Sequence, residues 1–122
     1  MNTDFTITEE TGCRLVTAIT PFGHLGPKHH GLIVGRSKAD GLLYVAESRH
    51  TGYGLTDYET FVTRYRGNGP INLIPPLNAD LARNSAKRAL DEITRKNQTP
   101  YNLLFNNCES FVNRHVAGHS AS

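Results

Sequence analysis

The sequence predicts an α+β domain in which an antiparallel β-sheet packs against helices from the C-terminal part of the chain. Two observations lead to this class. Short apolar stretches before residue 75 are separated by turns rich in glycine and proline, which is typical of antiparallel strands. After residue 78 the apolar residues recur instead at helical spacing. The chain has 122 residues, 38% of them hydrophobic, so we expect a single domain spanning residues 1–122 with its own core.

The first part of the chain is expected to contribute one strand. Residues 1–11 are polar and predict a loose leader, and residues 119–122 predict a tail. Residues 13–19 alternate weakly between two sets of side chains, which favours a strand. Residues 21–28 contain two prolines and two glycines and therefore predict a turn or an open loop.

A β-hairpin is expected next. The compact apolar stretch at 29–35 predicts its first strand, and residues 42–48 predict the partner strand. The polar segment 36–41 between them ends in Asp40-Gly41, a dipeptide typical of tight hairpin turns. The two strands should therefore pair antiparallel across this loop.

The segment after the hairpin is less regular. Gly52 and Gly54 predict a further turn. Residues 56–65 form a short polar segment for which a helical turn is one interpretation. Residues 71–74 predict another strand, closed by the Pro75-Pro76 pair.

The clearest helix follows Asn78, a residue type that caps helix N-termini. Between residue 79 and about residue 95, the apolar side chains fall on one helical face. They stand at positions 82, 86, 89, 90 and 93. Asp80 near the start and Arg95 near the end suit the helix dipole. Thr99-Pro100 should end this segment, before a second C-terminal helix.

Composition argues against several classes of function. The net charge of +2 and the lack of a basic run predict no nucleic-acid partner. The apolar runs are too short to span a membrane, and the polar N-terminus does not resemble a signal peptide. The two cysteines, Cys13 and Cys108, fit a cytoplasmic protein with reduced thiols. Common metal and nucleotide motifs are missing from the sequence, so we expect no metal and no cofactor.

Cys108 is the strongest candidate for chemistry. It follows Asn106-Asn107 and precedes an amphipathic segment, which predicts a cysteine in the first turn of a helix. The helix dipole and unpaired backbone N–H groups there favour the thiolate, the nucleophilic form. The same N–H groups can receive a developing oxyanion. The alternative is a buried cysteine that acts as a small apolar residue.

A cysteine nucleophile needs a base, and the base needs an orienting group. His29 and His30 open the apolar strand, and strand alternation sends them to opposite faces. Pairing across the hairpin loop puts residue 29 near residue 48 and brings His29 within reach of Glu47. That carboxylate can hold one imidazole nitrogen and leave the other for the thiol. The alternatives are a strand-end histidine and a glutamate that faces solvent, and Tyr44 or Ser48 is the alternative orienting group.

The segments around these residues resemble a known family. The stretch Tyr101-Asn-Leu-Leu-Phe-Asn-Asn-Cys-Glu-Ser-Phe111 resembles the Asn-Cys-Glu-x-Phe box of the lecithin–retinol acyltransferase-like proteins. These are circularly permuted relatives of the NlpC-type papain-like peptidases. The stretch His29-His-Gly-Leu-Ile-Val-Gly35 resembles the histidine strand of that family, and its frame selects His29 over His30. The resemblance covers about residues 12–118.

The resemblance implies a circularly permuted papain-like fold and a thioacyl-enzyme mechanism. Cys108 would be the nucleophile and His29 the base, and Glu47 would complete a Cys-His-Glu triad. Tyr101, which matches a family tyrosine near the site, and Asn107 are the candidates for oxyanion support. A packed core tyrosine is the alternative for Tyr101.

The chain also departs from the family. Ser110 stands where many members have histidine, and Glu47 lies on the strand where lipid-acting animal members carry a second histidine. An acid there is closer to bacterial permuted amidases and peptidases. We expect a thiol hydrolase or acyltransferase for an acyl-ester, lipid-like substrate. The alternatives are an amidase or peptidase that cleaves peptide or isopeptide bonds, and a non-catalytic binding module that retains the fold.

Overall fold

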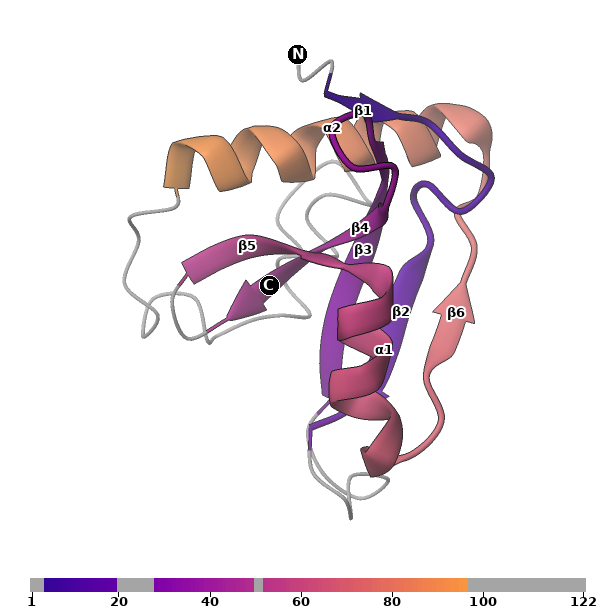
Figure 1. Ribbon diagram of the computed structural model, residues 1–122. Coiled ribbons are helices and arrows are strands. Elements are labelled where there is room, and N and C mark those ends of the chain that lie inside the picture. Colours follow the sequence, from indigo (N-terminus) through magenta and orange to yellow (C-terminus); the bar gives the residue numbers. More distant parts are fainter. Residues whose placement is uncertain (1–3, 20–27, 50–51, 97–122) are drawn as a thin grey trace.

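The computed structural model describes residues 4–19, 28–49 and 52–96, which form an antiparallel β-sheet with a helix on each face (Figure 1). The sheet order is β5-β4-β3-β2-β6, and β1 pairs with the part of β3 that extends beyond β2. The strands are β1 Phe5–Thr6, β2 Arg14–Ala18, β3 Lys28–Ser37, β4 Leu43–Arg49, β5 Gly52–Asp57 and β6 Asn72–Ile74. The predicted α+β class, with an antiparallel sheet and a C-terminal helix, is confirmed.

The predicted hairpin is formed by β3 and β4, but its register differs from the expected one. Gly31 lies opposite Glu47, whereas the sequence placed residue 29 near residue 48. A β-bulge just before Gly35 shifts the register within the hairpin by one residue. The expected register was wrong because β3 continues to Ser37, two residues into the expected loop, and the bulge corrects only one of these two residues.

The two helices lie on opposite faces of the sheet. α1 (Tyr58–Tyr65) lies in front of the strands in Figure 1, and α2 (Ala79–Lys96) crosses their upper end. The core cluster on the α1 face consists of Cys13, Leu15, Ile33, Val45 and Phe61. The cluster on the α2 face consists of Leu32, Val34, Ala46, Tyr53, Ala86, Ala89, Leu90 and Ile93. Neighbouring residues of β3 thus alternate between the two clusters, as side chains of a strand do.

The predicted start and buried face of α2 are confirmed. Asn78 Oδ1 accepts a hydrogen bond from the backbone N–H of Leu81 at 2.8 Å, which satisfies one of the unpaired donors at the helix start. The apolar positions that were predicted to face the sheet are all buried. They are Ala82, Ala86, Ala89, Leu90 and Ile93. Gly12 approaches this helix so closely that a Cβ on it would lie 2.6 Å from the Cα of Ala82.

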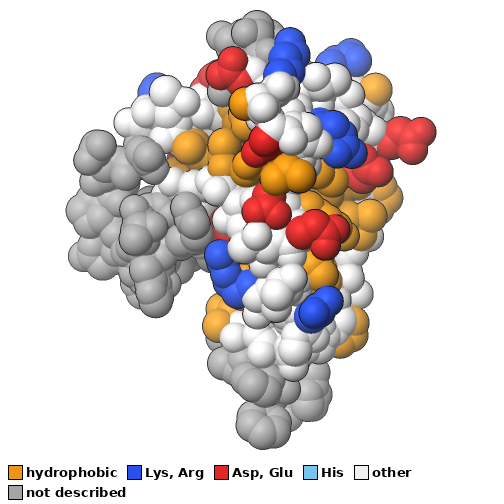
Figure 2. All heavy atoms as spheres, viewed as in Figure 1, with side chains coloured by type: hydrophobic (Ala, Val, Ile, Leu, Met, Phe, Trp, Pro, Cys, Tyr) orange, Lys and Arg blue, Asp and Glu red, His pale blue; other side chains and the backbone are white. Residues whose placement is uncertain are grey.

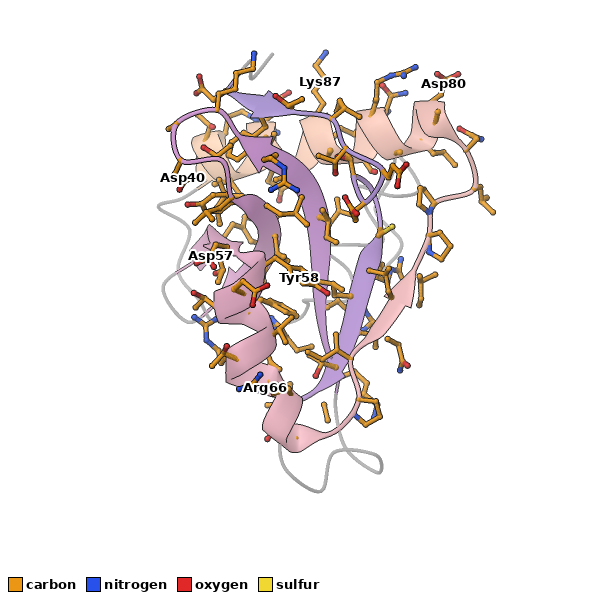
Figure 3. All side chains as sticks on the ribbon, turned by 45° about the vertical axis from the view of Figure 1, so that its right-hand side comes forward. Asp40, Asp57, Tyr58, Arg66, Asp80 and Lys87 are labelled. Atoms are coloured by element: carbon orange, nitrogen blue, oxygen red, sulfur yellow. The ribbon has the colours of Figure 1, made fainter. Side chains whose placement is uncertain are left out.

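α1 begins where β5 ends. Asp57 caps it by accepting hydrogen bonds from the backbone N–H of Thr60 at 3.0 Å and from the Thr60 hydroxyl at 2.7 Å. Figure 3 shows Asp57 and Tyr58 at the start of the helix and Arg66 beyond its other end. η2 (Arg66–Asn68), a short 3-10 helix, continues the chain toward β6.

Two segments differ from the sequence-based expectation. Residues 5–6, in the expected loose leader, form β1, and Thr11 is only 1% exposed. The turn expected at Gly52 and Gly54 is wrong, because both residues belong to β5, which pairs along β4. The second C-terminal helix, which was expected to begin near Cys108, lies outside the described residues.

Charged side chains are dispersed on the side of the molecule that carries α1. Figure 2 shows acidic and basic side chains mixed with apolar ones, and neither sign forms a continuous patch on this face. This distribution agrees with the small net charge of +2.

Candidate active site

His29 and Glu47 meet on the α1 face of the sheet. His29 Nε2 lies 2.6 Å from Glu47 Oε1, and the two residues are 5% and 0% exposed. Glu47 lies opposite Gly31, and His29 is two residues away from Gly31 on the same strand. The two side chains therefore share a face and meet diagonally across the strand pair. The predicted proximity of His29 and Glu47 is confirmed.

Two further donors bind the second carboxylate oxygen of Glu47. The hydroxyl group of Thr56 on β5 donates a hydrogen bond to Oε2. Arg64 on α1 donates from Nη1 to the same oxygen at 3.2 Å. The carboxylate thus connects its own strand to β3, β5 and α1. Such donors are needed because a buried carboxylate without partners is strongly unfavourable.

These contacts keep Glu47 ionised. Burial alone would raise the pKa of its carboxyl group, because a low-dielectric surrounding disfavours charge. The hydrogen bonds from His29 and Thr56, together with the charges of His29 and Arg64, outweigh this effect and hold the pKa below its ordinary value. An ionised Glu47 can accept the imidazole N–H and fix the orientation of the ring.

Two aromatic side chains of α1 lie against the imidazole of His29. The Tyr65 ring stacks on it with centroids 4.8 Å apart, and the Phe61 ring lies 5.8 Å away. Gly31 makes this close approach of α1 possible, because a Cβ there would lie 2.6 Å from Val45 Cγ1 and 3.2 Å from Phe61 Cε2. The helix therefore shields the histidine from solvent.

His30 lies on the other face of β3. It pairs with Val16 of β2, whereas His29 pairs with Thr17, and successive residues of a strand alternate between faces. The strand geometry agrees with the selection of His29 as the histidine that can meet Glu47.

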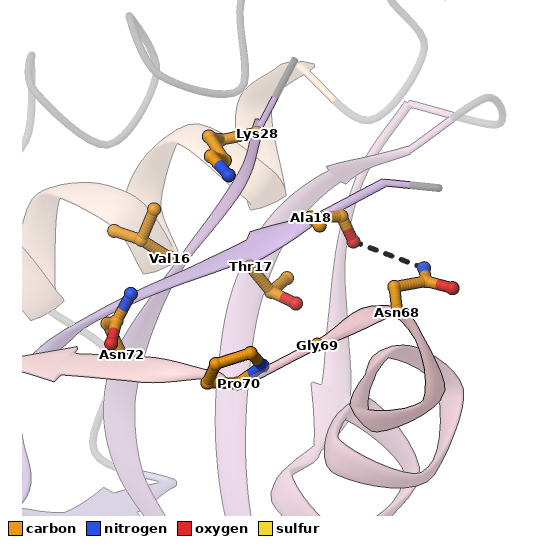
Figure 4. A pocket seen from close by; sticks show the side chains of 8 residues that line it. All are labelled: Val16, Thr17, Ala18, Lys28, Asn68, Gly69, Pro70 and Asn72. Carbon is orange, nitrogen blue, oxygen red and sulfur yellow. Dashed lines mark hydrogen bonds between the residues drawn. The ribbon is translucent and has the colours of Figure 1, made fainter. Parts of the chain in front are cut away.

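A pocket of about 430 Å³ opens at the edge of the sheet, between the end of β2 and the η2–β6 connection (Figure 4). Its lining consists of Val16, Thr17, Ala18, Lys28, Asn68, Gly69, Pro70 and Asn72. Thr17 is the cross-strand neighbour of His29, but His29 itself is not among the lining residues. The lining mixes a lysine and two amide side chains with small apolar groups, which suits a polar ligand better than a long alkyl chain.

The pocket exists because β6 separates from β2. Their pairing ends where Asn72 lies opposite Val16. Beyond this point Asn68 spans the gap, and its Nδ2 donates to the carbonyl oxygens of Ala18 and Ile19 at 3.1 and 2.9 Å. The side chain of Asn68 thus ties the η2–β6 connection to the end of β2, and Figure 4 shows its hydrogen bond to Ala18.

The structure brings together two of the residues selected from the sequence. Cys108, Tyr101 and Asn107 lie outside the described residues. Thr56 and Arg64, which sequence reasoning missed, are 9 and 17 positions from Glu47 along the chain. A strand assignment for 52–57 would have indicated Thr56. No sequence signal pointed to Arg64.

Cys13 is a contrasting thiol. It is a free cysteine, 5% exposed, in the core cluster of the α1 face. Burial raises the pKa of its thiol, and the charge of Glu10 raises it further. A thiol in this state is a poor nucleophile, so Cys13 has a packing role.

Comparison of the chain with protein-family models, with curated proteins and with solved structures found no match. Within residues 4–19, 28–49 and 52–96, no cluster of three or more His, Cys, Asp or Glu side chains could hold a metal ion. No helix in this part of the chain is long and apolar enough to cross a membrane. The candidate site is therefore defined by the buried histidine and its ionised carboxylate partner.

Proposed function

We propose that the protein is a thiol hydrolase or acyltransferase in which Cys108, His29 and Glu47 act as a catalytic triad. The observation that carries this proposal is the buried hydrogen bond between His29 Nε2 and Glu47 Oε1. A histidine with one nitrogen on an ionised carboxylate has its second nitrogen, Nδ1, directed away from that partner, as a general base requires. The resemblance of the Cys108 box to the lecithin–retinol acyltransferase-like proteins, and so to a permuted papain-like fold, supports the same proposal.

In the proposed reaction, the Cys108 thiolate attacks the carbonyl carbon of an ester or amide. His29 gives its proton to the leaving oxygen or nitrogen, that bond breaks, and a thioacyl enzyme forms. Water or a second acceptor then loses a proton to His29 and attacks the thioester, which releases the Cys108 thiolate. Glu47 orients the imidazole and stabilises its charged form. Backbone N–H groups beside Cys108, with Tyr101 and Asn107, receive the oxyanion.

The proposed substrate is an acyl ester, because the Asn-Cys-Glu box around Cys108 is the most specific signal in the sequence. The second candidate is a peptide or isopeptide amide, which the polar lining of the pocket at the edge of β2 favours. A reducing compartment such as the cytoplasm is the proposed place of action, because Cys108 must remain a thiol.

Turnover of acyl-ester, phospholipid and peptide-amide substrates by matched variants tests this proposal. Cys108→Ala and His29→Ala should each lower kcat/KM by roughly a thousandfold or more, because nucleophile and base act as a unit. For the same reason the double variant should lose little beyond either single variant. His30→Ala is the matched control on the other face of β3 and should stay within about tenfold of the wild type.

Two outcomes would overturn the proposed roles. Turnover that survives in His29→Ala but is lost in His30→Ala would mean that the wrong histidine has been assigned. A folded wild-type protein that turns over no member of the three substrate classes would favour the non-catalytic binding module.

A further inference from the structure

The proposed triad leaves Arg64 of α1 without a role, although it touches the site directly. Arg64 Nη1 lies 3.2 Å from Glu47 Oε2, and His29 Nε2 lies 2.6 Å from Oε1. Arg64 and His29 therefore bind the two oxygens of one carboxylate. The side chain of Arg64 is 40% exposed, whereas that of Glu47 is fully buried at 0%.

Arg64 is positively charged and held in place. Burial alone would lower the pKa of its guanidinium, but interactions with Tyr65 and Glu47 raise the pKa above its ordinary value. The Arg64 guanidinium carbon lies 5.8 Å from the centroid of the Tyr65 ring, and the same ring stacks on His29. Tyr65 therefore contacts both Arg64 and His29.

A buried carboxylate whose only partner is histidine stabilises the imidazolium and so makes it a weaker acid. A second cation on that carboxylate has the opposite effect, because it offsets part of the negative charge and repels the imidazolium. In the described part of the chain, the His29 ring contacts Glu47 from β4 and Tyr65 from α1, and Arg64 binds the other oxygen of Glu47. Thr17 of β2 lies opposite His29, and Thr56 of β5 binds Glu47.

We propose that Arg64 is a positioning residue that lowers the proton affinity of His29 by binding the second oxygen of Glu47. The charge of Arg64 produces the effect. The use of this effect rests on the proposed function, since a lower proton affinity helps the His29 imidazolium to give its proton to the leaving group. The effect itself does not depend on Cys108 or on a substrate.

NMR titration of the histidine ring signals in the full-length protein tests this proposal, and His29→Gln identifies the signal of His29. Arg64→Met should raise the titration midpoint of His29 by roughly 0.5 to 1 pH unit, the order expected for one charge at this range. Arg64→Gln retains an N–H donor without the charge, and it should raise the midpoint to a similar extent. Arg64→Lys retains the charge, so its His29 midpoint should stay within about 0.3 pH unit of the wild-type midpoint.

Arg66→Met is the matched control. Arg66 is exposed and begins η2 just beyond α1, so this change removes the same charge close to the site. Its effect on the His29 midpoint should stay below about 0.2 pH unit, because exposed charges are screened by solvent. A midpoint that does not rise in Arg64→Met or Arg64→Gln would overturn the proposal, as would an equal rise in Arg66→Met.

The titration also separates this inference from the proposed function. A rise in the midpoint without substrate turnover by the wild type would support the role of Arg64 and count against catalysis. Turnover with an unchanged midpoint would support catalysis and overturn the role of Arg64. If the midpoint rises and the wild type also turns over substrate, the midpoint in the pH profile of kcat/KM that reports His29 should shift by the same amount as the NMR midpoint.

Discussion

Glu47 is the residue on which the candidate site depends. Its carboxylate is fully buried, yet it stays ionised because Thr56 and Arg64 bind one oxygen and His29 binds the other. The contact between His29 and Glu47 could be predicted from the sequence, because the two residues lie on adjacent strands of one hairpin. Thr56 and Arg64 could not be predicted in this way, because their contacts require β5 and α1 to be placed in three dimensions.

Replacing Glu47 should destabilise the protein in a pH-dependent manner. The pKa of Glu47 is lowered in the folded state, so the carboxylate stabilises the fold at pH values above its unfolded pKa of about 4.3. That stability is lost as the pH falls through the folded pKa. Glu47→Gln should therefore lower the free energy of unfolding by about 3 kcal/mol at pH 7, and the difference from wild type should shrink toward pH 3.

Urea denaturation of both proteins at pH 7 and pH 3 measures this difference. Glu59→Gln is the matched control, because Glu59 lies exposed in the first turn of α1. Its effect should stay within about 0.5 kcal/mol at both pH values. If the Glu47→Gln deficit is the same at both pH values, the stabilising group is not an ionised carboxylate.

At the scale of elements, α2 could be predicted and β5 could not. α2 carries apolar residues at helical spacing, a cap at Asn78 and an acidic first turn, and these local signals agree with one another. β5 contains Gly52 and Gly54, which locally favour a turn. Gly54 lies opposite Glu47 in the sheet, so its strand conformation is stabilised by pairing with β4, which no local signal reveals.

The packing of α1 on β3 leads to a prediction for Gly31. A methyl group there would lie 2.6 Å from Val45 Cγ1 of β4 and 3.2 Å from a ring carbon of Phe61 of α1, so Gly31→Ala should displace the Val45 side chain and shift α1 slightly away from the sheet. We expect a loss of about 1–3 kcal/mol in the free energy of unfolding, as for other overpacked cores. Thermal and urea denaturation measure this loss.

Gly67→Ala provides the matched control for this change. A Cβ at Gly67 would meet no atom within 4 Å, and this glycine has no positive φ in the structure. The substitution should be neutral or raise stability by up to about 1 kcal/mol, because alanine restricts the unfolded chain. Equal stability of the two variants would show that the contact between Gly31 and α1 is not tight.

At the scale of the whole molecule, the candidate triad joins distant parts of the chain. β3 and β4 supply His29 and Glu47, and α1 shields them, while Cys108 comes from the C-terminal segment. The order of the three candidate residues along the chain and the role proposed for each could be predicted from the sequence. The hairpin register could not, because β3 continues two residues into the expected loop and a bulge then shifts the pairing back by one residue. If the triad is correct, the reactivity of Cys108 must depend on the folded state.

The two cysteines should change places in reactivity when the chain unfolds. In the folded protein, an ion pair with His29 should lower the pKa of Cys108, so that iodoacetamide alkylates it rapidly at pH 6. In concentrated urea, Cys108 should have an ordinary thiol pKa near 8.5 and react roughly ten- to a hundredfold more slowly. Cys13 should do the reverse, because it is buried with a raised pKa in the folded protein and becomes accessible in urea.

Mass spectrometry of the peptides that contain Cys13 and Cys108 measures both rates in one sample. His29→Gln should lower the folded-state rate of Cys108 to the rate in urea, because the cation that stabilises the thiolate is lost. His30→Gln is the matched control and should leave Cys108 fast, because His30 lies on the other face of β3. A folded Cys108 that reacts no faster than the unfolded one would show that the fold does not activate this thiol, and the proposed triad would then be wrong.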